Sequence, residues 1–342
     1  MITIDGSLGE GGGQVLRTAL GLSLITGQSF RIYNIRARRK KPGLKRQHLC
    51  AVQAAQQIAS ADVSGLKLGS LELSFHPRKT QPGEYHFSIG TAGSTSLVLQ
   101  TILPALLLAE GPSHFILEGG THNPLAPPFE FIEKVFLPII HRMGPKVEIC
   151  LDRYGFYPAG GGKVRVEIQP ADALLPLEIM ERGFIKDFGA QAKVAHLPIK
   201  IAERELKVIK HQLPLVAKKL EIQEILNSPG PGNVVMVEVV AEQITEVFTA
   251  FGALGKPAEK VAQEVVEETQ EYLDSGVPVG KYLADQLLIP LALAGRGGFK
   301  TLPLTQHTQT NILVLNRFLD KDFVIKELDK NQTLVEVCSP KA

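Results

Sequence analysis

Apolar and polar residues alternate over residues 2–5, which predicts a short strand because neighbouring side chains of a strand point to opposite faces. From 14 to 25 the apolar residues recur with helical spacing. The glycine-rich segment 6–13 lies between these two elements, and a turn that opens a helix in this way offers backbone N–H groups to an anion. It is not a P-loop, because no Gly-Lys-Ser/Thr follows, and the acidic residue of a dinucleotide-binding fingerprint is missing.

The same two patterns continue along the chain. Alternation predicts strands at 30–35, 66–76, 85–89, 114–118, 163–168, 191–196, 234–241, 323–328 and 333–338. Helical spacing predicts helices that end near 60 and 143, and further helices at 97–109, 202–220 and 257–273. An apolar helix is expected at 287–294, directly after the polar segment 282–286, and another begins directly after His307.

Similar segments recur in this series. Gly6-x-x-Gly9 and Gly90-x-x-Gly93 each precede a helix, and 100–109 resembles 286–294 in sequence. A strand that begins near a phenylalanine follows each helix, and then a polar loop with a histidine: His48, His122 or His307. Either this is an internal repeat of about 80 residues, which is the size of a folding unit, or common helix-entry patterns coincide.

We expect an α+β fold on the repeat interpretation. Three βαβαβ-type units with pseudo-threefold symmetry would form a large domain from 1–180 and 276–342. Between them the chain becomes more charged, so 181–275 is predicted to be a smaller inserted α/β domain.

Composition is that of an ordinary globular protein, with 44% hydrophobic and 21% charged residues. The three cysteines form no pair that suggests disulfides or zinc. No signal peptide and no apolar run long enough for a bilayer is seen. We therefore expect a cytoplasmic protein that does not associate with membranes.

Charge is distributed unevenly although the net charge is only +2. No acidic residue lies between Glu10 and Asp62, and this gap contains nine basic residues, among them Arg17, Arg36 and Arg39. Guanidinium groups match phosphate in shape and charge, so the gap predicts a phosphate-binding face. The alternative is a solvated basic loop, as most charge runs are.

Two further side chains are candidates for chemistry. His307 lies between a strand and a helix, where it can be a nucleophile, a base or a ligand, or a capping histidine. Glu10, among glycines, can hold a divalent cation beside phosphates, or be solvated. The amides of Gln100 and Gln286 suit a purine edge, and Tyr282 can stack on a base, but all three can equally be structural.

Taken together, seven motifs resemble those of the RNA 3′-terminal phosphate cyclase family over nearly the whole chain. They are Gly9-Glu10-Gly-Gly-Gly-Gln14-x-x-Arg17, Arg36-x-x-Arg39-x-Lys-Pro-Gly-Leu-x-Arg-Gln47-His48, Gly90-x-Ala-Gly-Ser-x-x-Leu-Val-Leu-Gln100, Gly-Gly-Thr-x-Asn-Pro-x-Ala-Pro-Pro128, Gly155-Phe-Tyr-Pro-Ala-Gly-Gly-Gly162, Tyr282-Leu-Ala-Asp-Gln286 and His307-x-x-x-Asn311. One departure is that Arg153-Tyr154 precedes Gly155, where a histidine is common in the family.

This resemblance implies an ATP-dependent reaction in three steps. His307 would attack the α-phosphorus of ATP and expel pyrophosphate, the adenylate would pass to an RNA 3′-phosphate, and the 2′-hydroxyl would displace AMP to leave a 2′,3′-cyclic phosphate. It further implies the following roles: catalysis by His307, Arg17, Arg36 and Arg39; ATP binding by Gln100, Pro128, Tyr282, Leu283, Ala284, Asp285 and Gln286; RNA phosphate binding by Arg36, Arg39, Gln47 and His48; and a Mg²⁺ or Mn²⁺ ion at Glu10.

Three other functions fit parts of the sequence. One is a non-catalytic paralogue that binds RNA and serves ribosome assembly, and another is a relative of the enolpyruvyl transferases; the presence of His307 argues against both. The third is a plain RNA-binding module, supported by the basic run alone. The sequence carries no signal for one particular RNA, for an oligomeric state, for the role of 181–275 or for the roles of His48 and His122.

Overall fold

The computed structural model describes residues 1–213 and 219–338. In these ranges the chain forms a mixed α/β structure with four four-stranded sheets. None of the described helices is long and apolar enough to cross a membrane. The predicted cytoplasmic location stays a prediction.

The first sheet has the order β1-β2-β4-β3, in which β1 and β2 are parallel and the other neighbours antiparallel. Its segment of chain contains β1 (Ile2–Asp5), α1 (Gln14–Thr26), β2 (Phe30–Tyr33), α2 (Arg46–Ala59), β3 (Asp62–Ser64) and β4 (Leu73–His76).

The second and third sheets share this arrangement of one parallel and two antiparallel pairs. The second has the order β5-β6-β8-β7, and its segment contains β5 (Glu84–Ser88), α3 (Thr95–Leu106), β6 (Ser113–Gly119), α4 (Phe129–Phe131), the π-helical turn η1 (Ile132–Phe136), α5 (Leu137–Arg142), β7 (Lys146–Arg153) and β8 (Gly162–Gln169). The third has the order β9-β14-β16-β15 and contains β9 (Leu177–Ile179), α8 (Lys281–Ala294), β14 (Gly297–Thr301), α9 (Gln306–Phe318), β15 (Asp322–Asp329) and β16 (Gln332–Cys338).

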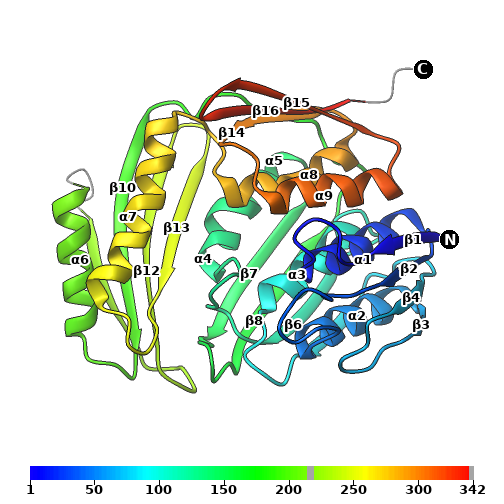
Figure 1. Ribbon diagram of the computed structural model, residues 1–342, viewed down its shortest axis with the longest axis horizontal. Coiled ribbons are helices and arrows are strands. Elements are labelled where there is room, and N and C mark those ends of the chain that lie inside the picture. The colour runs from blue at the N-terminus through cyan, green and yellow to red at the C-terminus, as the bar shows by residue number, and fades with distance from the viewer. Residues whose placement is uncertain (214–218, 339–342) are drawn as a thin grey trace.

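The fourth sheet is formed by chain that lies between β9 and α8, in the order β11-β10-β12-β13. Its elements are β10 (Ile185–Ala195), α6 (Lys200–Gln212), β11 (Leu220–Ile225), β12 (Gly232–Ala241), β13 (Thr245–Phe251) and α7 (Ala258–Ser275). It lies on the left in Figure 1, with α6 and α7 on its outer face. Val235, Val237 and Phe248 belong to a second hydrophobic cluster between this sheet and those helices. The threefold symmetry and the domain bounds 1–180, 276–342 and 181–275 stay predictions.

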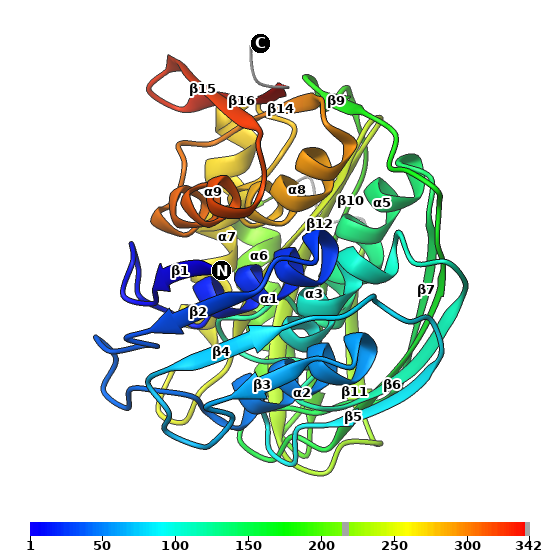
Figure 2. The same cartoon turned by 90° about the vertical axis from the view of Figure 1, so that its right-hand side faces the viewer.

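The main core lies between the first three sheets. There α1 packs against α3 and α9, and α9 against α8, and Figure 2 shows these helices in the middle with sheets around them. Leu16, Ile102, Leu287 and Leu315 are all completely or almost completely buried in this cluster. A helix surrounded in this way is apolar on all sides, which explains why α3 and α8 have long apolar runs.

Some element boundaries differ from those predicted. The helix predicted at 202–220 ends at Gln212, and Leu220 already begins β11; residues 214–218 lie outside the described residues. The strand predicted from 66 begins only at Leu73. The prediction also missed β3, β7, β9, β11 and β13, each of which is the last strand at one edge of its sheet.

Candidate active site

Other segments of the chain approach the glycine-rich segment 6–13 so closely that side chains larger than glycine would not fit at several of its positions. Gly9 has φ +55°, and a Cβ there would collide with Thr310 of α9. A Cβ on Gly13 would collide with the ring of His48 in α2, and one on Gly12 would lie 3.0 Å from Nη2 of Arg39. Glycine, which tolerates positive φ and close approach, therefore lets α9, α2 and the basic loop converge on this turn.

His307 is the second residue of α9, so the helix begins one residue before the histidine and not after it as predicted. The hydroxyl of Thr305 caps this helix by accepting the N–H of Thr308 at 3.1 Å. The His307 side chain is 42% exposed. Nε2 lies 2.6 Å from Oε2 of Glu10, and Nδ1 lies 3.7 Å from Oδ2 of Asp285. Two carboxylates thus face the two ring nitrogens.

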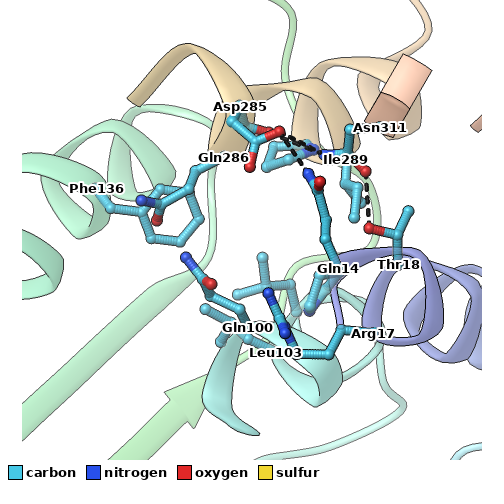
Figure 3. A pocket seen from close by; sticks show the side chains of 13 residues that line it. Gln14, Arg17, Thr18, Gln100, Leu103, Phe136, Asp285, Gln286, Ile289 and Asn311 are labelled. Carbon is cyan, nitrogen blue, oxygen red and sulfur yellow. Dashed lines mark hydrogen bonds between the residues drawn. The ribbon is translucent and has the colours of Figure 1, made fainter. Parts of the chain in front are cut away.

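Asp285 is held by side chains from two other helices. Its Oδ1 accepts from Gln14 Nε2 at 2.8 Å and from Asn311 Nδ2 at 3.2 Å. Thr18 in turn donates to Oδ1 of Asn311 at 2.7 Å (Figure 3). This network ties α1, α8 and α9 together. Sequence reasoning did not assign roles to Gln14, Thr18 or Asn311, although Asn311 stands four residues after His307 and so on the same helix face.

A cavity of about 60 Å³ lies beside this network. Figure 3 shows the amides of Gln100 and Gln286 approaching it from α3 and α8, opposite α1. Its lining consists of Gln14, Arg17, Thr18, Gln100, Leu103, Pro104, Leu107, Phe136, Asp285, Gln286, Ile289, Pro290 and Asn311. Oε1 of Gln14 and Oε1 of Gln286 are buried and have no hydrogen-bond partner. Since buried acceptors are normally satisfied, these oxygens suit a ligand that carries N–H or O–H groups.

Arg17 supplies a cation at the wall of the cavity. Burial lowers its pKa to about 10, while Asp285 and Glu10 act in the opposite direction. The guanidinium therefore stays charged at neutral pH, in a place where its charge is weakly screened. It is suited to bind a phosphate.

The two loop arginines differ in their contacts. Arg39 is exposed and its guanidinium pairs with Oε1 of Glu10. Arg36 is buried, and its Nη1 donates to the carbonyl oxygens of Lys41 and Gly43, each at 2.8 Å. Burial, and then Arg39, lowers the pKa of Arg36. Glu10 thus contacts both Arg39 and His307 and links them. Arg36 instead stabilises the conformation of the loop through its hydrogen bonds to the backbone.

Gln47 and His48 connect the start of α2 to neighbouring turns. Oε1 of Gln47 accepts from the N–H of Ser94 at 2.8 Å. His48 is buried, and its Nδ1 accepts from the N–H of Lys45 at 3.0 Å. Burial, followed by Arg17, lowers the pKa of His48 to about 3. His48 is therefore a neutral ring, and it packs closely against Gly13.

The other predicted ATP-binding residues lie outside the cavity lining. The hydroxyl of Tyr282 donates to Oε1 of Glu268 at 2.7 Å, and half of the residue is exposed. Leu283 and Ala284 are in the core, and Pro128 is buried directly before α4. Their roles toward ATP stay predictions.

A metal ion would find few protein ligands here. Among residues 1–213 and 219–338, no group of three or more His, Cys, Asp and Glu side chains is arranged to hold one. Mg²⁺, however, commonly takes one or two carboxylates together with water and substrate phosphates. Glu10, whose carboxylate is paired with His307 and Arg39, fits that kind of site.

Glu246 is a buried acid at the base of α8 that sequence reasoning missed. It lies on β13, and its Oε1 accepts from the N–H of Gly280, directly before α8, at 2.6 Å. Burial raises its pKa to about 8, although the Gly280 bond acts against this. The start of α8, the helix that carries Asp285 and Gln286, is therefore hydrogen-bonded to a carboxyl group that is protonated at neutral pH.

We expect the free energy of unfolding to fall as pH rises from about 4.5 to about 8 because of Glu246. In that window the folded chain keeps a proton that the unfolded chain has lost, so folding is favoured at low pH, by up to about 1.4 kcal/mol per pH unit. Urea titrations at pH 5, 7 and 9 measure this slope. Glu246→Gln should flatten it, and Glu221→Gln, at an exposed position of β11, should not. Equal slopes in all three proteins would contradict this role of Glu246.

Comparison with known proteins gives a consistent result. The family model described as "RNA 3′-terminal phosphate cyclase" matches residues 8–325. A curated protein of that name from Koribacter versatilis is 53% identical over 96% of this chain and 92% of its own length. Another from Ectopseudomonas mendocina is 48% identical over 98% of both chains. Among solved structures, the enolpyruvyl transferase NikO from Streptomyces tendae matches with a TM-score of 0.39 at 10% identity, over 98% of this chain and 48% of that one, which is too weak a likeness to support a function.

Proposed function

Because this chain belongs to the RNA 3′-terminal phosphate cyclase family, we propose that it converts an RNA 3′-phosphate end to a 2′,3′-cyclic phosphate at the expense of ATP. The observation that carries this proposal is the placement of His307 between Glu10 and Asp285, beside a cavity with a half-buried arginine and two unpaired amide oxygens. A nucleophile, a cation for phosphate and acceptors for a nucleoside are thus adjacent.

In the first step a ring nitrogen of His307 attacks the α-phosphorus of ATP. A P–N bond forms, the bond to the bridging oxygen breaks, and pyrophosphate leaves. The attacking nitrogen must present a lone pair. At 2.6 Å from Glu10, Nε2 serves as a donor in the resting arrangement. Once Glu10 turns away, Asp285, which lies 3.7 Å from Nδ1, can move closer and accept a hydrogen bond from Nδ1–H. This fixes the tautomer that leaves the lone pair on Nε2 for the attack.

ATP would lie with its adenosine in the cavity and its phosphates toward the glycine-rich turn. Gln100 and Gln286 would contact the nucleoside, together with the predicted contributions of Pro128 and residues 282–285. Arg17 would bind the α-phosphate and stabilise the negative charge that develops during transfer. Glu10 would hold Mg²⁺ or Mn²⁺, which neutralises the charge of the departing pyrophosphate when bound.

In the second and third steps the RNA end reacts. An oxygen of the RNA 3′-phosphate attacks the adenylate phosphorus and frees the imidazole. The 2′-hydroxyl then attacks the phosphorus attached to the RNA 3′-oxygen, and the bond from that phosphorus to the bridging oxygen breaks. AMP leaves with the bridging oxygen, and the hydroxyl proton is lost to solvent or a nearby base. Arg39 would bind the RNA phosphate directly. Arg36, Gln47 and His48 would keep the loop and the start of α2 in position for it.

The direct test follows both the protein and the RNA. With α-labelled ATP and Mg²⁺ or Mn²⁺, the protein should acquire covalent AMP. A 5′-labelled oligonucleotide with a 3′-phosphate should become resistant to phosphatase and release one AMP per end. A protein that binds the oligonucleotide but neither labels nor cyclises would instead be the non-catalytic RNA-binding paralogue.

We also infer that the fold arose from a repeated unit with one insertion. The support is that the first three sheets share one strand order, while the fourth sheet has another order and is formed by chain that lies between β9 and α8.

A further inference from the structure

The turn between β7 and β8 carries an exposed aromatic side chain that the proposed reaction does not use. Tyr157 is 67% exposed and belongs to the motif Gly155–Gly162, which has no role in the site described above. Figure 1 places this turn at the lower edge of the molecule, away from α9, the helix that carries His307. An exposed aromatic ring offers a flat face on which a ligand can stack.

Three turns meet around Tyr157. Phe156 pairs with His122 as an isolated strand-like bridge. Asn123 Nδ2 donates to the carbonyl oxygen of Ala92 at 2.5 Å, and a Cβ on Gly160 would lie 2.6 Å from Cα of Ala92. We call the exposed part of these turns the turn platform; it consists of Gly90, Thr91, Pro124, Leu125, Tyr157, Pro158 and Ala159.

Leu125 on this platform is held in an unfavourable conformation. It is completely exposed and has φ +65°, a region that costs a side chain with a Cβ about 1 kcal/mol or more. The loop that carries it is closed by a 2.8 Å hydrogen bond between His122 and Glu130, and Ser96 binds the carbonyl oxygen of Pro127 at 2.7 Å. The fold therefore forces an apolar side chain of the turn platform into solvent.

The platform continues the predicted phosphate-binding surface. Gln47, at the end of the basic segment 36–47, binds the N–H of Ser94, two residues after Ala92. The platform itself has no charged side chain. Asp152 at the end of β7 is neutralised by Arg165 at 2.9 Å. An uncharged surface with an aromatic ring, adjoining a cationic one, is the combination that binds single-stranded nucleic acid: cations follow the phosphates and aromatic rings stack on bases.

We propose that the turn platform binds the single-stranded nucleotides on the 5′ side of the RNA 3′-phosphate, with a base stacked on Tyr157 and against Leu125. This inference rests on the proposed function, since it assumes that an RNA end occupies the site at His307. The chain then selects ends with a single-stranded overhang and is indifferent to base identity, because every base has a π-face.

The test compares Tyr157→Ala, Tyr157→Phe and, as the matched control, Phe184→Ala, which removes another exposed ring from the loop before β10. For a single-stranded 12-mer with a 3′-phosphate, Tyr157→Ala should lower kcat/KM about 5- to 100-fold. Tyr157→Phe and Phe184→Ala should retain it. Self-adenylation without RNA should be unchanged in all three, and the loss should vanish for a dinucleotide substrate too short to reach the platform.

A second measurement uses the absence of tryptophan from the chain. Tyr157→Trp and Phe184→Trp each introduce a single fluorophore, and a 12-mer with an unreactive 3′-hydroxyl should quench the first and not the second. Suppose that the unchanged protein cyclises RNA, that Tyr157→Ala is as active as the unchanged protein on substrates of every length, and that RNA does not quench the fluorescence of Tyr157→Trp. These results together would overturn the inference, and the platform would then be assigned to a protein partner. A protein that fails to label with AMP or to cyclise RNA would instead contradict the proposed function.

Discussion

Replacing His307 by alanine is expected to lower covalent labelling with AMP by at least about a thousandfold, because loss of the proposed nucleophile leaves only binding and positioning effects. The ring lies 2.6 Å from Glu10 and 3.7 Å from Asp285, and no second histidine is close to it in the described contacts: His48 is buried beneath Gly13 and His122 pairs with Glu130. Labelled ATP, followed by denaturing electrophoresis, measures the effect.

His114→Ala is the matched control. His114 is about half exposed and lies 4.0 Å from a glutamate, as His307 lies near Glu10, but it is on β6, away from the cavity. This variant should label like the unchanged protein. His307→Ala should still convert preformed RNA-adenylate to the 2′,3′-cyclic phosphate, since the proposed third step does not use the imidazole. Labelling of His307→Ala at the normal rate would place the adenylate on another residue.

The second large effect is expected from Lys193→Met, which should lower the free energy of unfolding by about 3–5 kcal/mol. Lys193 extends from β10 of the fourth sheet to Glu130 of α4 and to the hydroxyl of Tyr154 at 3.2 Å. Burial opposes ionisation of Glu130, but His122 and Lys193 outweigh it and hold its pKa below the ordinary value. Removal of Lys193 leaves this buried carboxylate with His122 alone.

Lys134→Met provides the comparison, since it breaks another ion pair between the same parts of the chain. Lys134 of η1 binds Glu238 of β12 at 2.6 Å, with side chains 42% and 30% exposed, so solvent screening limits its loss to about 1 kcal/mol or less. The double variant Lys193→Met/Glu130→Met should recover part of the single loss, because it removes the unpaired charge as well. Denaturant unfolding measures all three. Equal losses for Lys193→Met and Lys134→Met would refute the buried pair as the stronger link.

Strands and helices with regular patterns could be predicted from the sequence, and the contacts that complete the site could not. Alternation over Ile2–Asp5 and helical spacing over Gln14–Thr26 reflect local geometry, and both elements form as predicted. The bond between Gln14 and Asp285 depends on how α1 packs against α8, which no local pattern encodes. For the same reason the sequence left His48 open: only its burial against Gly13 and Arg17 shows why its ring stays neutral.

Two glutamines predicted to bind ATP line the cavity, and one aromatic residue predicted to do so lies outside its lining. Gln100 and Gln286, matched as equivalent positions of two similar helices, line one cavity. Tyr282 was selected for its ring, but its hydroxyl binds Glu268 of α7 and it lies outside that lining. Glu246 escaped notice because the strand that carries it, β13, was not predicted, and a lone glutamate gives no sign that it is buried.

Gly9 and Thr310 are in close contact although they lie near opposite ends of the chain. The site at His307 can therefore form only late in synthesis. The turn that carries Glu10 emerges early from the ribosome, and the helix that carries His307 emerges only when most of the chain, including the whole fourth sheet, has been synthesised. A nascent chain therefore holds a glycine-rich turn without the proposed nucleophile, and the two meet only after long-range folding. Covalent AMP would accordingly mark finished molecules and be absent from prematurely terminated ones.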